Sequence, residues 1–325
     1  MSVEVRKMQK TSDGTFFLTL PKSWASRFNL VKGSPIYIRE RGDGCIVLDP
    51  EYAVDFAPEV TIKGLSRIKE EIISHYLLGY EVIMIEAARF TSEDRERIRH
   101  IISSLIGVEI VEEEPGRMVL QCPLKASAFS PDKILRREYV LSSEMFKDAL
   151  RSFINFDLPL AESVVEQDEE VDRLYFLIVR LLRTLIMNPR LSEKLNVSLI
   201  DCLDYRLISS LIEGIADQSV QIGRLTSRLH KTATPPEVAL MFSEVGEMIK
   251  ESYEEAVKAV FARTERTLVR ATDKMRETES RLKRLEERLD SAQPNLAPAI
   301  LNCGSILQRI FGSLLDILDL VNLRK

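Results

Sequence analysis

Two pairs of acidic residues are placed where they could bind a cation. Asp168 and Asp172 are four positions apart, as are Glu213 and Asp217, in segments otherwise rich in Leu and Ile. Positions i and i+4 share one face of an α-helix, so each pair borders the apolar stripe expected to be buried. If the two helices pack antiparallel, all four carboxylates face one patch. Like charges held close together are costly unless a cation compensates them.

Carboxylate oxygens from facing helices suit hard cations such as Mg²⁺, Mn²⁺ and Ca²⁺, and they also bind iron and zinc. The alternative is that all four acids are ordinary solvated residues, because such pairs are common on helix surfaces. The three histidines and four cysteines are scattered and form no CxxC motif. The cysteines are therefore predicted to be reduced apolar side chains, and no site based on His or Cys is indicated.

The elements that carry these acids are helices in two similar groups. From about residue 132 onward the sequence shows helical periodicity and no strand signal. Breaks at 157–159, 188–189, 232–236 and 291–298 divide this region. They predict helices at 132–156, 160–187, 191–231, 236–262, 263–291 and 297–323. The six helices are interpreted as two tandem three-helix bundles, residues 132–231 and 236–325.

Tandem three-helix bundles with E/DxxxD motifs on the second and third helices resemble the PhoU family of phosphate-uptake regulators. The motifs are Asp168-Glu169-Glu170-Val171-Asp172 and Glu213-Gly214-Ile215-Ala216-Asp217, and the resemblance covers about residues 135–325. It implies that these motifs hold a multinuclear metal cluster, often iron or zinc, on the bundle surface.

The second bundle departs from this pattern. Asp273 and Glu277 form only a partial match, and the segment from Gln308 to Gly312 lacks both acids. One metal site per chain is therefore expected. A period-seven apolar row in the same region instead predicts a helix-packing seam, formed by Leu268, Met275, Leu282, Leu285 and Leu289.

Residues 59–126 predict a small α/β domain. Strands are expected at 60–63 and 80–87, helices at 65–78 and 91–106, and a hairpin turns at Pro115-Gly116. This β-α-β-α-β-β order suggests a split βαβ arrangement.

The N-terminal residues 1–50 form a basic, β-rich segment. Residues 1–41 contain eight Lys and Arg against three acids, a net charge of +5, whereas the rest of the chain carries −10. A strand is expected at 16–21, helical turns at 22–29 and a hairpin turning at 41–44. So few large apolar residues make a poor independent core, which favours a partner subunit.

Three stretches of this segment resemble the swapped-hairpin SpoVT/AbrB DNA-binding fold: 7–10, 14–24 and 30–34. The resemblance implies an obligate dimer. Two basic segments together would neutralise phosphates, and the residues expected to contact DNA are Arg6, Lys7, Lys10 and Lys22. The alternative is a module that only dimerises. No base-reading pattern is present, so the target sequence is not predicted.

The whole chain is therefore expected to be multidomain α+β, with a swapped-hairpin β domain, a small α/β domain and an all-α region. A chain that combines these two resemblances is similar to archaeal PhoU-type regulators. They imply a homodimeric transcriptional regulator of phosphate uptake that binds DNA and metal and contacts a phosphate transporter component or a sensor protein.

Two other functions remain open. The chain could be an adaptor that dimerises without binding DNA and inhibits a phosphate transporter, or a carboxylate-bridged metalloenzyme. The sequence has no Walker loop, GxGxxG, GxSxG or HExxH motif, so no enzyme is expected. It also lacks an apolar run of membrane-spanning length and a signal-peptide core, so a cytoplasmic protein without membrane insertion is expected.

Overall fold

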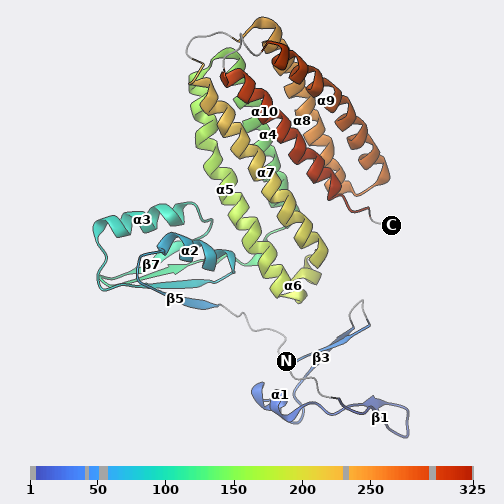
Figure 1. The fold of residues 1–325 in the computed structure, drawn as a ribbon. Coiled ribbons are helices and arrows are strands. Elements are labelled where there is room, and N and C mark those ends of the chain that lie inside the picture. Colours follow the sequence, from blue (N-terminus) through green and yellow to red (C-terminus); the bar gives the residue numbers. More distant parts are fainter. Residues whose placement is uncertain (1–4, 41–43, 51–57, 230–233, 293–297, 324–325) are drawn as a thin grey trace. The chain divides into compact units, whose positions relative to one another are not determined.

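The computed structural model describes residues 5–40, 44–50, 58–229, 234–292 and 298–323. The chain separates into two compact units, residues 1–57 and 58–325 (Figure 1). No helix in the described ranges is long and apolar enough to cross a membrane.

The described residues of the N-terminal unit form two small antiparallel sheets and one short helix. Its elements are β1 (Gln9–Lys10), β2 (Phe16–Phe17), α1 (Lys22–Arg27), β3 (Tyr37–Glu40) and β4 (Ile46–Asp49). No side chain described in this unit is buried, and Phe16 and Ile38 are 63% and 70% exposed. A unit without a core cannot be stable alone, because burial of apolar surface is the main force that drives folding.

A strand is predicted at 16–21. In the structure only the two residues of β2, Phe16–Phe17, form a strand in this range. The turn predicted at 41–44 falls between β3 and β4 in the sequence, and residues 41–43 lie outside the described part of the chain.

The second unit begins with a four-stranded sheet covered by two helices. Its elements are β5 (Glu59–Lys63), α2 (Ile68–Leu77), β6 (Val82–Glu86), α3 (Ser92–Ser103), β7 (Glu109–Glu113) and β8 (Arg117–Gln121). The strand order is β5-β6-β8-β7, with β5 parallel to β6 and the other pairs antiparallel. The expected split βαβ arrangement is wrong, because the parallel strands β5 and β6 are direct neighbours and no strand lies between them.

The rest of the second unit is a helical bundle. Its elements are α4 (Pro131–Asn155), α5 (Leu158–Met187), α6 (Pro189–Lys194), α7 (Leu199–Thr226), α8 (Pro236–Ala262), α9 (Glu265–Ala292) and α10 (Pro298–Asp319). The breaks predicted at 232–236 and 291–298 fall partly outside the described residues.

The helix predicted at 191–231 is wrong, because it is divided into α6 and α7. Asn196 has a left-handed backbone (φ 54°), which ends helical geometry before α7. Ser198 then starts α7 with a capping box, in which its side chain accepts from the Asp201 backbone and the Asp201 side chain accepts from the Ser198 backbone.

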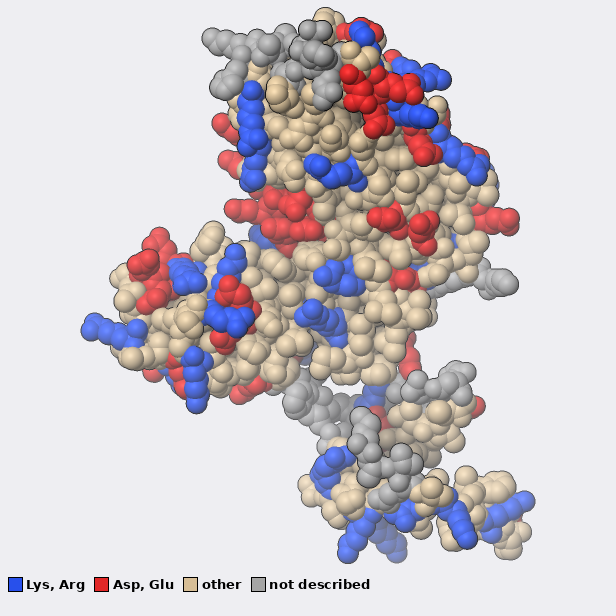
Figure 2. Space-filling view, viewed as in Figure 1, with Lys and Arg blue, Asp and Glu red and all other residues tan. Residues whose placement is uncertain are grey.

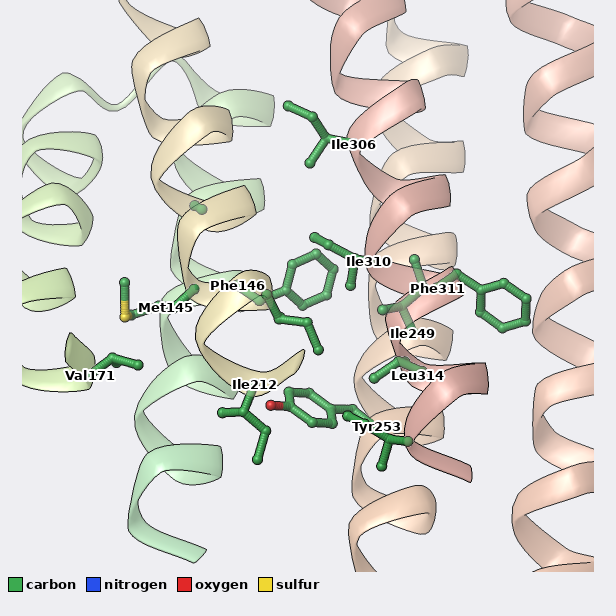
Figure 3. Packing of buried hydrophobic residues seen from close by; sticks show 14 of the residues in the cluster. Met145, Phe146, Val171, Ile212, Ile249, Tyr253, Ile306, Ile310, Phe311 and Leu314 are labelled. Carbon is green, nitrogen blue, oxygen red and sulfur yellow. The ribbon is translucent and has the colours of Figure 1, made fainter. Parts of the chain in front are cut away.

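The two halves of the bundle share a local signature and one core. Helices α4 and α8 both have proline at the first helical position and end at a left-handed residue, Phe156 and Arg263 respectively. Figure 3 shows side chains from both halves packed together, including Phe146 of α4, Ile212 of α7 and Ile310 of α10. The tandem units therefore fold as one body.

The predicted packing seam on α9 is confirmed. Met275, Leu282, Leu285 and Leu289 are buried in the bundle core, and Leu268 is half-buried. Most charged side chains of α9 are exposed.

Arg180 fastens the α/β domain to the bundle. It lies on α5, is buried, and donates to the backbone carbonyls of Tyr76 (2.6 Å), Tyr80 (2.9 Å) and Gly79 (3.2 Å). These carbonyls lie at and just beyond the C-terminal end of α2, where the helix dipole favours a cation. Its guanidinium also lies 4.9 Å from the centre of the Tyr76 ring.

We expect Arg180→Met to lower the free energy of unfolding by about 2–4 kcal/mol, because one buried and two partly buried carbonyls lose a charged donor. Urea unfolding followed by circular dichroism measures this change. The exposed Arg183, three residues further along α5, supplies the matched control Arg183→Met. Equal stability of the two variants would show that Arg180 does not fasten the domain.

Candidate carboxylate site and basic N-terminal surface

The four predicted carboxylates lie on two helices packed side by side. Helices α5 and α7 run antiparallel, and Figure 2 shows acidic side chains gathered over their middle turns. Asp168, Asp172 and Glu213 are half-buried and Asp217 is exposed. Their neighbours Val171 and the row Ile212, Ile215 and Ala216 are buried in the core. The apolar faces therefore pull the acids to the border between the two helices.

The four carboxylates act on one another electrostatically. Burial, followed by the charges of Asp172 and Asp217, raises the pKa of Asp168 to about 6. Burial and the charges of the other three acids raise the pKa of Glu213 to about 7. The pKa of Asp172 is also raised, first by burial and then by Asp217. The predicted residues thus form one coupled group of negative charge across α5 and α7.

Basic residues around the group only partly offset this charge. Arg206 lowers the pKa of Glu213, Arg224 lowers that of Asp168, and Lys69 of α2 lowers that of Asp172, each less than burial raises it. Arg206 is itself engaged elsewhere, because it donates to the Tyr175 hydroxyl at 2.6 Å.

The donor set fits a hard divalent cation by its chemistry, since it offers partly desolvated carboxylate oxygens that repel one another. It does not form a closed ligand set. Within the described ranges, no three His, Cys, Asp or Glu side chains stand close enough to hold one metal ion. The structure thus brings the predicted acids into one patch without assembling them around one point.

A fifth carboxylate, not predicted from the sequence, lies beneath the patch. Glu138 of α4 is fully buried, and both of its oxygens lie 2.9 Å from the Ser209 hydroxyl of α7. Burial raises its pKa well above the usual range, and the charge of Glu213 adds to this effect. A signal was present, because Glu138 continues the buried row of Ile134, Ser142 and Met145 at helical spacing.

The acids of the second half have a different environment. Asp273 and Glu277 are exposed on α9. Lys274 lies between acids of two helices, 2.5 Å from Glu251 of α8 and 3.1 Å from Glu277. Arg270 similarly pairs with Glu255 at 2.9 Å. Here the chain's own basic side chains compensate the acids.

The predicted DNA-contacting residues lie on the surface of the N-terminal unit. Arg6, Lys7, Lys10 and Lys22 are all exposed, with Lys10 on β1 and Lys22 opening α1. The Lys10 ammonium group lies 5.2 Å from the centre of the Phe16 ring on β2. Figure 2 shows basic side chains spread over this unit, with few acidic ones among them.

Comparison with known proteins finds a matching family model for part of each of these two regions. The PhoU domain matches residues 135–226, which carry all four carboxylates. The family described as antidote-toxin recognition MazE, bacterial antitoxin, matches residues 9–52. No curated protein matches the chain.

Solved structures resemble the helical region. PhoU from Pseudomonas aeruginosa is 18% identical with a TM-score of 0.52, over 59% of this chain and 93% of that one. The phosphate transport system regulatory protein PhoU from Streptococcus pneumoniae is 15% identical with a TM-score of 0.44, over 59% of this chain and 87% of that one. At such identities the likeness concerns the fold alone. The chain therefore carries a PhoU domain with a PhoU-like helical fold, preceded by an N-terminal domain of the MazE/AbrB type.

Proposed function

We propose that this chain is a DNA-binding transcriptional regulator of phosphate uptake. The observation that carries the proposal is the presence of a MazE-type domain and a PhoU domain on one chain. The charge distribution supports it, because the net charge of +5 over residues 1–41 contrasts with −10 over the rest. A basic end attracts nucleic acid, and an acidic body does not compete for the same ligand.

The regulator acts as a homodimer joined through its N-terminal units. Support comes from the exposed apolar side chains of that unit, which a second copy would cover. Two copies double the basic charge on one surface, so Arg6, Lys7, Lys10 and Lys22 supply eight cations for backbone phosphates.

The helical body binds a divalent cation through Asp168, Asp172, Glu213 and Asp217, and it contacts a phosphate transporter component or a sensor protein. The support is the coupled charge of these carboxylates, which a bound cation would relieve. Iron and zinc are the metals that the family resemblance implies, and the all-oxygen donor set also suits Mg²⁺, Mn²⁺ or Ca²⁺.

A gel-shift titration of the full chain with the DNA upstream of its own coding region tests the proposal. We expect retardation at low salt that disappears at high salt, because phosphate contacts release counterions. Absence of retardation at low salt would contradict DNA binding and leave the adaptor that dimerises only.

A further inference from the structure

One face of α7 presents a continuous apolar row to solvent. Leu199, Ile200, Leu203 and Leu207 are all exposed, and their spacing places them along two turns of one side of the helix. At the end of α5, Ile186 and Met187 are exposed as well. Ile186 lies three helical turns beyond Tyr175, which contacts Arg206 of α7, so it lies level with the connection that precedes α7 and not within the row itself.

This row differs from the other exposed apolar residues of the bundle. Val140, Leu240 and Val269 lie singly on three different helices, and single exposed apolar side chains are common. The four residues of the α7 row are contiguous and apolar, and the charged residues on the same turns, Asp204 and Arg206, are less exposed than they are. Contiguous apolar surface of this kind marks a docking face.

The charges at the two ends of the row are opposite. The acidic patch begins at Glu213, ten residues beyond Leu203, which corresponds to about 15 Å along the helix. Beyond the other end of the row, α6 carries the half-buried Arg190 and the exposed Lys194 against one exposed acid, Glu193, and α5 carries the exposed Arg183. An antiparallel copy of this surface would match apolar row to apolar row and acidic end to basic end.

We infer that the α7 row is the contact surface for a second copy of this chain, with the two α7 helices antiparallel about a two-fold axis near Leu203. In this arrangement Lys194 of each copy lies opposite the carboxylate patch of the other. Such a two-fold interface uses the same patch on both copies. The partner's lysine thereby places a cation beside the acids that the first copy leaves uncompensated.

The area of the α7 row fits a contact between two copies that are already joined through their N-terminal units. The four side chains of the row expose roughly 400 Å² per copy, within the range of a functional patch on a protein surface. Two rows would bury about 800 Å², the apolar centre of an interface of standard size. The inference rests on the proposed N-terminal dimer only for the high local concentration that this dimer gives the second copy.

Cysteine cross-linking tests the inference. In a Cys45→Ser background of the full chain the other native cysteines, Cys122, Cys202 and Cys303, are buried, so Leu203→Cys supplies a single accessible thiol. Leu240→Cys on α8 is the matched control, because Leu203 and Leu240 are 57% and 61% exposed. Mild oxidation, without DNA and with a chelator, should give a disulfide-linked dimer for Leu203→Cys and little for Leu240→Cys.

Charge reversal then tests the register. Lys194→Glu should lower the yield of the Leu203→Cys dimer several-fold, and adding Asp217→Lys to the same chain should restore it. Equal cross-linking of Leu203→Cys and Leu240→Cys, or none at Leu203→Cys, would overturn the inference and indicate a different protein as the occupant of the row. Because neither DNA nor metal is present, this result is independent of the test of DNA binding.

Discussion

Alanine at all four predicted DNA-contacting positions is expected to weaken binding to DNA by about a hundredfold or more at low salt, because each dimer loses eight cations near the phosphates. Titration of a labelled duplex followed by fluorescence anisotropy measures the affinity. The substituted residues are Arg6, Lys7, Lys10 and Lys22, all exposed and none buried in a core, so the fold should persist.

The matched control removes the same charge from the helical body. Four exposed basic residues of α9 can be replaced by alanine: Arg266, Arg276, Lys283 and Arg284. This variant should bind DNA nearly as tightly as the unaltered chain. If both variants lose affinity equally, the basic N-terminal surface is not the DNA-binding site.

The second large effect concerns the carboxylate patch, and its sign follows from the raised pKa values. Asp168 and Glu213 hold their protons to about pH 6 and pH 7 in the folded chain, above their ordinary values of 3.8 and 4.5. The folded state therefore binds more protons than the unfolded state in this window. The contribution of these two groups to the free energy of unfolding therefore falls as pH rises from about 4 to about 7, and it then levels off.

Asp168→Asn with Glu213→Gln removes this penalty. We expect the double variant to be more stable than the unaltered chain at pH 8 by about 1–3 kcal/mol, a range reduced because both groups are only half-buried. At pH 4 the two proteins should be equally stable. Thermal or urea unfolding at both pH values measures the difference, and Glu162→Gln with Glu166→Gln on the exposed side of α5 is the matched control.

Mn²⁺ should reverse the order of stability at pH 8. It should raise the melting temperature of the unaltered chain and of the control, because a bound cation stabilises the folded state. The double variant should show no such rise. An equal rise in all three proteins would mean that the cation binds elsewhere.

The helical part of the fold could be predicted because its signals are local. Prolines and caps lie at the ends of α4, α5 and α8, and the apolar periodicity between them is strong. The break between α6 and α7 also has a local signal in the sequence, since Ser198 and Asp201 have capping-box spacing. The long apolar periodicity on either side of this break concealed it.

Features that depend on tertiary packing could not be predicted in the same way. The pairing of β5 with β6 depends on which strands meet, and several strand orders suit one β-α-β-α-β-β sequence. The spacing of the four acids predicted their common patch. Whether they surround one point depends on the rotation of α5 against α7, which spacing does not determine. The helical spacing of Glu138 indicated that it is buried, but its place beneath the patch depends on how α4 packs against α7.

The N-terminal unit also has a feature that depends on packing and could not be predicted from local sequence, namely the length of its strands. Its β2 strand is only two residues long, although residues 16–21 have clear strand propensity. Exposed apolar residues such as Phe16 and Ile38 have no core to join within one chain. Long strands in this segment would need the second copy that the proposed dimer supplies.

The salt dependence of DNA binding by the full chain tests the central claim most directly. The observed association constant should be measured by fluorescence anisotropy over a series of salt concentrations. If all eight basic residues contact phosphates, a plot of the logarithm of the association constant against the logarithm of the salt concentration should have a slope of about −7. If only about half of them do, the slope should be about −4. A slope near zero, or no binding at the lowest salt, would contradict the account of this chain as a DNA-binding regulator.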